Sequence, residues 1–162
     1  MKLVKESISF ERYKDPKKAL GLDIRELIEE WLKKNNFNSS GLQQNRINYA
    51  KQSYIINPDL TIDILFGWSV YLYEAIDELP EYIQFGEILG GSFTLENLGL
   101  TSMRGFPKKV NGDFSVRDNK LTSLEYCPEF VFGEFNCGDN TTQFTLDDVK
   151  NHCRVRGVIH TK

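Results

Sequence analysis

The sequence repeats itself with a strict period of 21 residues through its C-terminal half. Gly91 begins one copy, Gly112 begins the next, and Gly133 begins a third copy that decays before the end. Equivalent positions in the copies carry the same kinds of residue: Phe93, Phe114 and Phe135; Leu95, Val116 and Cys137; Leu100 and Leu121; Pro107 and Pro128. A fixed period of about 20–29 residues is typical of leucine-rich-repeat solenoids, so the repeat predicts a stack of parallel coils.

Each copy contains a short apolar core pattern. Phe114, Val116, Asn119 and Leu121 follow the pattern apolar-x-apolar-x-x-Asn-x-apolar. We expect Phe114 and Val116 to point inward from a short strand and Asn119 to lie where the chain turns, because a carboxamide can satisfy backbone groups of adjacent coils. Asn140 repeats this position, whereas the first copy has Leu98 there, so the expected asparagine ladder is incomplete.

Further elements are predicted at both ends of the repeats. Alternation at Ile62, Ile64, Val70 and Leu72 predicts strands, and the segment 70–80 resembles an earlier coil with altered spacing. A single apolar stripe predicts a helix that begins at residue 24 and ends at the asparagines 35–36, and we expect this helix to pack on the end of the repeats through Trp31. The segment 15–20 has the start and stop signals of a shorter helix. Residues 145–148 form a capping box that opens a helix through His152, and Val155, Val158 and Ile159 are expected to form a last strand.

The predicted fold class is therefore α+β: a short leucine-rich-repeat-like solenoid of about four coils, with an N-terminal helical cap and a C-terminal helix-strand cap. Residues 1–59 would form the N-terminal cap and a polar insertion, and residues 60–162 the solenoid with its C-terminal cap, together making one structural unit. Residues 36–58 are polar and weakly periodic, which predicts a long loop, with at most a turn of helix near Ile47.

The repeat unit resembles the short leucine-rich-repeat-like proteins encoded by tailed phages and prophages of Bacteroidetes. The N-terminal Lys-Glu-Ser-Ile-Ser-Phe-Glu-Arg, the following Asp-Pro-Lys-Lys-Ala-Leu-Gly and the segment from Phe144 to Cys153 are similar to the same group. Residues 36–54 depart from it. The resemblance implies a phage-type, non-enzymatic solenoid and leaves its partner open.

Charge is distributed unevenly along the chain. The net charge of the 162 residues is −3, with +3 in residues 1–60 and −6 in residues 61–162. The acidic part favours a partner with a basic surface and makes direct binding of nucleic acid unexpected. The sequence has neither an apolar run long enough to span a membrane nor a signal peptide, and its three cysteines do not suggest a disulfide framework. These features predict a cytoplasmic protein, and the phage resemblance places it in the host cytoplasm.

The sequence offers little for catalysis. Two cysteines, Cys127 and Cys137, align with apolar positions of the repeat and are expected to be buried. A zinc site formed by Cys127, Cys137, His152 and Cys153 is disfavoured because its spacing lacks the usual ligand pairs, and Asp147 with Asp148 is interpreted as a capping pair. We therefore expect no enzyme activity, no metal and no cofactor.

The remaining candidate site is the outward face of the repeated strands. We expect it to bind protein through six residues: Glu96, Asp113, Ser115, Arg117, Glu134 and Asn136. The leading hypothesis is a phage-type module that inhibits or redirects a host protein with a basic surface, such as a ribonucleoprotein of a nucleic-acid-handling defence complex, as an anti-CRISPR protein does. The alternatives are a virion or assembly component, and an RNA- or DNA-binding module using the basic residues of the N-terminal region. The polar insertion 36–58 is a competing location for the partner site.

Overall fold

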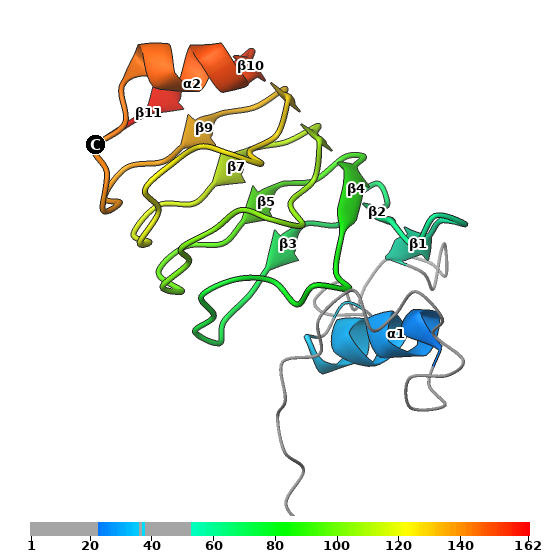
Figure 1. Cartoon of the computed structure of the whole chain (residues 1–162). Coiled ribbons are helices and arrows are strands. Elements are labelled where there is room, and N and C mark those ends of the chain that lie inside the picture. The colour runs from blue at the N-terminus through cyan, green and yellow to red at the C-terminus, as the bar shows by residue number, and fades with distance from the viewer. Residues whose placement is uncertain (1–22, 36, 38–52) are drawn as a thin grey trace, which may run out of the picture.

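The computed structural model describes residues 23–35, 37 and 53–162. These residues form two short helices and eleven short strands (Figure 1). In chain order the elements are α1 (Ile24–Lys34), β1 (Tyr54–Ile56), β2 (Ile62–Ile64), β3 (Val70–Tyr71), β4 (Phe85–Ile88), β5 (Phe93–Thr94), β6 (Lys109–Val110), β7 (Phe114–Ser115), β8 (Phe130–Val131), β9 (Phe135–Asn136), α2 (Leu146–His152), β10 (Arg154–Val155) and β11 (Ile159–His160). The helix expected within residues 15–20 and most of the polar insertion lie outside the described residues.

The strands form two sheets between which the chain alternates. The six-stranded sheet has the order β1-β2-β4-β6-β8-β10, and the five-stranded sheet has the order β11-β9-β7-β5-β3. Every pairing is parallel except that of β1 with β2, which is antiparallel. The described residues therefore form a β-solenoid of about four coils with two helices, which confirms the predicted solenoid architecture.

The strand register reproduces the sequence period. Phe93 pairs with Phe114, and Phe114 pairs with Phe135, each 21 residues further along the chain. The spacing lengthens at both ends, because Val70 pairs with Phe93 and Phe135 pairs with Ile159. The altered spacing predicted for the first coil is thus confirmed.

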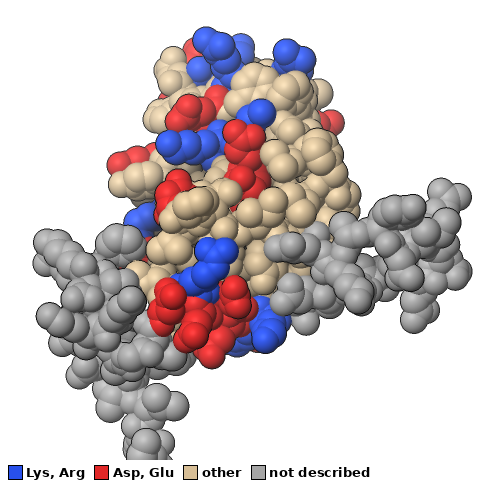
Figure 2. All heavy atoms as spheres, turned by 90° about the vertical axis from the view of Figure 1, so that its right-hand side faces the viewer, with Lys and Arg blue, Asp and Glu red and all other residues tan. Residues whose placement is uncertain are grey.

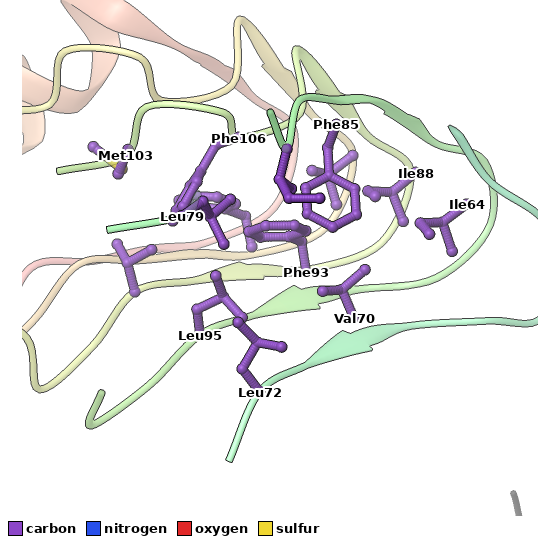
Figure 3. Packing of buried hydrophobic residues seen from close by; sticks show 14 of the residues in the cluster. Ile64, Val70, Leu72, Leu79, Phe85, Ile88, Phe93, Leu95, Met103 and Phe106 are labelled. Carbon is purple, nitrogen blue, oxygen red and sulfur yellow. The ribbon is translucent and has the colours of Figure 1, made fainter. Parts of the chain in front are cut away.

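A column of phenylalanines fills the interior. Phe93, Phe114 and Phe135 are each 0% exposed. The rings of Phe93 and Phe114 are stacked with centroids 6.0 Å apart, and those of Phe114 and Phe135 are 4.9 Å apart. Figure 3 shows Phe85 and Phe106 packed around Phe93, with centroid distances of 5.3 and 5.0 Å. Such aromatic pairs add to the stability gained by burying their large apolar surface.

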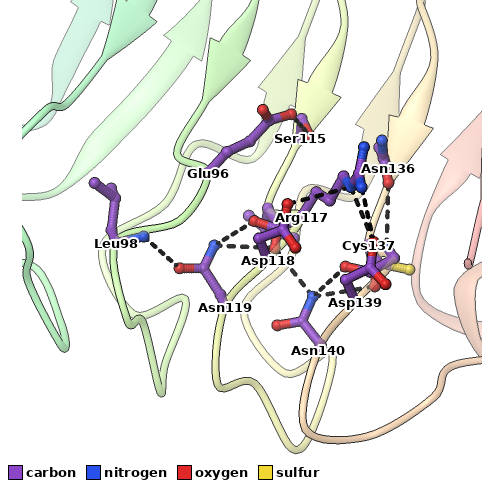
Figure 4. A network of polar contacts seen from close by, with 12 residues as sticks. Glu96, Leu98, Ser115, Arg117, Asp118, Asn119, Asn136, Cys137, Asp139 and Asn140 are labelled. Atoms are coloured by element: carbon purple, nitrogen blue, oxygen red, sulfur yellow. Dashed lines mark hydrogen bonds and ion pairs between the residues drawn. The ribbon is translucent and has the colours of Figure 1, made fainter.

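Asparagine side chains connect successive coils as the repeat predicts. The Oδ1 atom of Asn119 accepts hydrogen bonds from the backbone N–H groups of Leu98, Gly99 and Leu100, each at 3.1 Å. Its Nδ2 atom donates to three backbone carbonyls, those of Leu95, Val116 and Arg117. Asn140 binds the coil that precedes its own in a similar way: its Oδ1 atom accepts from the Leu121 N–H, and its Nδ2 atom donates to the Val116 carbonyl. Figure 4 shows both asparagines at the turns of their coils.

The repeated glycine allows two coils to approach closely. A Cβ atom on Gly112 would lie 2.4 Å from the carbonyl oxygen of Gly91, and one on Gly133 would lie 2.7 Å from the backbone of Gly112. Real Cβ atoms essentially never come so near another heavy atom. The glycine that opens each copy is therefore required by stacking.

The N-terminal helix has the predicted extent and buried stripe. Asp23 caps α1 by accepting from the Arg25 N–H, and Ile28 and Leu32 are fully buried. Trp31 contacts Phe85 edge to face, with ring centroids 6.4 Å apart. The helix thus joins the hydrophobic core at the first coil.

Two expectations need correction. Residues 54–56, expected to be part of a loop, form β1, because Tyr54 and Ile56 are buried and pair with β2. The expected single last strand is two strands, β10 and β11, in different sheets, and Val158 between them is exposed. The capping box of α2 forms as predicted, and this helix lies between β9 and β10 at the C-terminal end of the stack (Figure 1).

Candidate protein-binding face

The outer face of the five-stranded sheet presents side chains in rows that cross the coils. Strand pairing aligns five residues in one row: Tyr71, Thr94, Ser115, Asn136 and His160. Neighbouring members of a row are about 4.8 Å apart, which is the spacing of adjacent strands. The six candidate residues lie on this face, at or beside β5, β7 and β9, so the structure brings them together in register.

The three acidic candidates are exposed, and each has a partner on the same face. Glu96 accepts a hydrogen bond from the hydroxyl of Ser115. Asp113 accepts from the backbone N–H of Glu134 at 2.8 Å, and Glu134 lies 3.1 Å from the Nε2 atom of His160. These contacts fix the position of the carboxylates while leaving them in contact with solvent.

Arg117 lies between two aspartates at the turn of the coil (Figure 4). Its Nη2 atom is 3.0 Å from the Oδ2 atom of Asp139, and its Nε atom is 3.3 Å from that of Asp118. Both aspartates have a left-handed backbone conformation, which short polar residues tolerate. The hydrogen bond to Asp139, followed by the charge of Asp118, raises the pKa of Arg117. The only cation among the six candidates is therefore outweighed by its acidic neighbours.

Two candidates offer less to a partner than their sequence positions suggested. Ser115 is buried, and its hydroxyl is used by Glu96. Asn136 is half-buried, and its Oδ1 atom accepts from the backbone N–H of Gly138. Both residues support the face more than they project from it.

The sequence interpretation missed two aromatic residues beside this face. Tyr71 lies in the row described above and is 46% exposed, and Tyr73 follows in the same alternation and is 88% exposed. The sequence contains a signal for them: Val70 and Leu72 are the inward residues of a period-two pattern, and the outward residues of the same pattern are Tyr71 and Tyr73. Exposed tyrosines are enriched in protein–protein interfaces, where they contribute large apolar area together with a polar hydroxyl.

The cysteines are poor nucleophiles in this setting. Burial raises the pKa of Cys127 and that of Cys153 to about 12, and burial together with the nearby Asp148 raises that of Cys137 to about 11. Cys137 and Cys153 are buried, whereas Cys127, expected to be buried, is only partly so and lines a surface groove. The described residues contain no group of three or more His, Cys, Asp or Glu side chains placed to hold a metal ion.

That groove, of about 670 Å³, lies along the six-stranded sheet, where the return segments of the coils enter it. Its lining mixes charges of both signs, including Asp63, Glu87, Arg104 and Lys108. Asp63 is already engaged, because it accepts from the Glu87 N–H at 2.7 Å and from the Asn57 side chain at 3.0 Å. We identify no catalytic arrangement of nucleophile and base in it.

Comparison of the chain with protein-family models, with curated proteins and with solved structures found no match. Within the described part of the chain, neither helix has the length and apolar character needed to cross a membrane.

Proposed function

We propose that this chain is a non-enzymatic protein-binding module that uses the outer face of the five-stranded sheet. The observation that carries the proposal is the gathering of exposed carboxylates from consecutive coils on one face, with Tyr71 and Tyr73 at one end. Asp113 and Glu134 occupy equivalent positions of neighbouring coils, and Glu96 lies beside the row of Thr94 and Ser115. Parallel coils hold these side chains at a regular spacing, so the surface is organised before a partner arrives. Preorganisation of this kind lowers the entropic cost of association.

Electrostatics favours a basic partner. Residues 61–148 contain five Lys and Arg but fifteen Asp and Glu, a net charge of −10. Glu96, Asp113 and Glu134 contribute to this charge on the proposed face, and Asp118 and Asp139 surround its arginine. Acidic side chains opposite Lys and Arg of a partner accelerate encounter and disfavour neutral or acidic competitors.

The proposed partner class follows from the resemblance of the repeat to leucine-rich-repeat-like proteins of phages. A phage-type module without catalysis acts by occupying a host protein in the host cytoplasm. A nucleic-acid-handling defence complex fits, because such complexes carry basic surfaces for their RNA or DNA. In this proposal the module inhibits or redirects that complex by covering its basic surface.

The proposal is tested by affinity capture from host lysate treated with nuclease, followed by binding measurements with the captured protein. The key variant replaces Glu96 and Glu134 by Gln and Asp113 by Asn, which removes three charges but keeps the oxygen that Asp113 uses as an acceptor. Its matched control, Glu81→Gln/Glu125→Gln/Asp147→Asn, removes three exposed charges elsewhere.

We expect the face variant to bind at least about tenfold more weakly, mainly through a slower and less salt-sensitive association, and the control to bind as the unmodified protein does. Tyr73→Ala should also weaken binding, through a faster dissociation. Unchanged binding by the face variant, with loss on deletion of residues 38–52, would move the site to the insertion and refute the proposal.

A further inference from the structure

The last coil reverses the charge of the solenoid. Residues 149–162 contain Lys150, Arg154, Arg156 and Lys162 but no Asp or Glu, whereas residues 61–148 have a net charge of −10. Figure 2 shows the side of the molecule formed by the six-stranded sheet, with Lys and Arg side chains gathered at its upper end, where α2 and β10 lie in Figure 1. A basic surface therefore lies on a different sheet from the acidic binding face.

Strand register places aromatic and basic side chains together on this sheet. Lys109, Phe130 and Arg154 occupy one row, and Phe132 and Arg156 follow directly after the ends of β8 and β10. The guanidinium carbon of Arg156 lies 4.7 Å from the ring centre of Phe132 and 5.8 Å from that of Phe130. The two rings contact each other edge to face at 4.5 Å. This stacking holds the planar guanidinium of Arg156 in a defined position.

The arginines of the last coil have no carboxylate partner among the described residues. Of the five arginines that the structure describes, three form an ion pair: Arg25 with Glu29, Arg104 with Glu78, and Arg117 with Asp139. Arg154 and Arg156 form none within the described part of the chain, although both are exposed. Their hydrogen-bond donors are available for an external anion.

A surface pocket adjoins Arg154. It has a volume of about 440 Å³ and is lined by Phe130, Lys150, His152 and Arg154, among others. Glu129 is the only acidic residue of the lining. A carboxylate side chain entering this pocket would meet Lys150 and Arg154 together.

We propose that the surface formed by Phe130, Phe132, Lys150, Arg154 and Arg156 binds a short acidic segment of a protein. Carboxylates of the segment pair with Arg154, Lys150 and the guanidinium group of Arg156. An apolar side chain of the segment packs on the exposed part of Phe132. This surface goes beyond the acidic face of the proposed function: it lies on the other sheet and selects the opposite charge.

The observations favour an acidic protein segment over nucleic acid. Lys109, the cation of an earlier coil in the same row, is paired with Glu87. The arginines without a carboxylate partner among the described residues are confined to the last coil, and residues 61–148 carry a net charge of −10, so a long polyanion would be repelled a short distance away. One face of Phe132 is already occupied by Arg156, which removes a platform for base stacking. A few carboxylates with an apolar neighbour match both the extent and the composition of the surface.

The test measures fluorescence anisotropy of a labelled dodecapeptide rich in glutamate and leucine, with a lysine-for-glutamate peptide and an oligouridylate of equal length as comparison probes. The protein variant is Arg154→Gln/Arg156→Gln. The matched control is Lys108→Gln/Lys120→Gln, which removes the same charge from exposed lysines in other coils. Thermal melting of each variant verifies folding, and Arg156→Lys provides a milder change that retains the charge.

We expect the acidic peptide alone to bind, and the double arginine variant to bind it about tenfold more weakly, as for loss of two exposed charge pairs. The lysine control should bind within about twofold of the unmodified protein. Arg156→Lys should weaken binding to an intermediate degree, because lysine lacks the planar guanidinium group and its paired N–H donors. Equal binding by the double arginine variant, or tighter binding of the oligouridylate than of the peptide, would overturn the proposal.

Discussion

The carboxamide of Asn119 accepts a hydrogen bond at 3.1 Å from the backbone N–H of Leu98, the residue that occupies the equivalent position in the preceding coil. The same oxygen also serves Gly99 and Leu100, so one side chain satisfies three donors of the adjacent turn. Asn119 is only 6% exposed, which prevents water from replacing these bonds. The side chain thus links the turns of consecutive coils.

Asn119→Ala should lower the free energy of unfolding by about 3 kcal/mol or more, because it leaves several buried backbone groups without a partner. Asn140→Ala should cost less, since Asn140 is only partly buried and water can reach its site. Urea denaturation followed by circular dichroism gives both values. Equal losses for the two variants would contradict the role assigned to burial.

Phe114→Ala should cost about 3–5 kcal/mol, through lost burial and a cavity between Phe93 and Phe135. Phe66→Ala is the matched control, because Phe66 is 75% exposed and its loss should change stability by no more than about 0.5 kcal/mol. Both are measured by chemical denaturation. A Phe114→Ala protein as stable as the unmodified one would show that the register of the repeat is wrong.

Gly112→Ala should destabilise the protein strongly, because the new methyl group would meet the Gly91 carbonyl oxygen at 2.4 Å and force the coils apart. Gly67→Ala tests conformational strain alone: its φ is +83°, but nothing lies within 4 Å of the added atom. We expect a cost of about 1 kcal/mol there. If the two variants melted at the same temperature, close packing of the coils would not explain the repeated glycine.

The thiols should react slowly with a disulfide reagent such as dithionitrobenzoate at pH 8. Burial raises the pKa of Cys127 to about 12, so very little of the reactive thiolate is present at that pH. Protein unfolded in guanidinium chloride should react rapidly and release about three equivalents of thionitrobenzoate per chain, one for each cysteine. Fast reaction of one thiol in the folded protein would contradict the high pKa values, and Cys127→Ser would then show whether the partly exposed cysteine is responsible.

Acid should destabilise the protein partly through α2. The backbone N–H and the hydroxyl of Thr145 both donate to Asp148, which holds the pKa of Asp148 below its usual 3.8. A lowered folded-state pKa adds stability above the unfolded-state value, and this stability is lost as the pH falls through the folded-state value.

Asp148→Asn should therefore flatten the dependence of stability on pH below about pH 4. Asp59, whose pKa is lowered by hydrogen bonds from Thr61, should preserve part of that dependence. Urea titrations between pH 2 and pH 6 follow the change. An unaltered pH profile in Asp148→Asn would contradict the role of the capping box.

The period of the sequence was sufficient to predict the coils, the phenylalanine column and the role of Asn119, because each depends on which residues share a face. The six-stranded sheet was not predicted. Its strands β6 and β8 are two residues long, too short to show alternation, and they are defined by backbone pairing with neighbouring coils.

The site was predictable only in outline. Strand alternation placed Glu96, Asp113 and Glu134 on one face. Ser115, however, is buried and donates a hydrogen bond to Glu96, which no spacing rule specifies. The basic surface was missed because charge was summed over residues 61–162 as a whole. That sum hides the reversal at residue 149, and only the strand register shows that Arg156 stacks on Phe132.

The close contact of Gly112 with Gly91 also means that the molecule can change its length only in whole steps. A duplicated 21-residue unit would insert one strand into each sheet, bring its own glycine and asparagine, and lengthen the stack by about 4.8 Å. A shorter insertion would add no strand to either sheet: the longer spacings at the two ends of the stack are absorbed between strands, and Val70 and Ile159 still pair with their neighbours. A lineage of such chains would thus adapt to larger or smaller targets by gaining or losing complete repeat units.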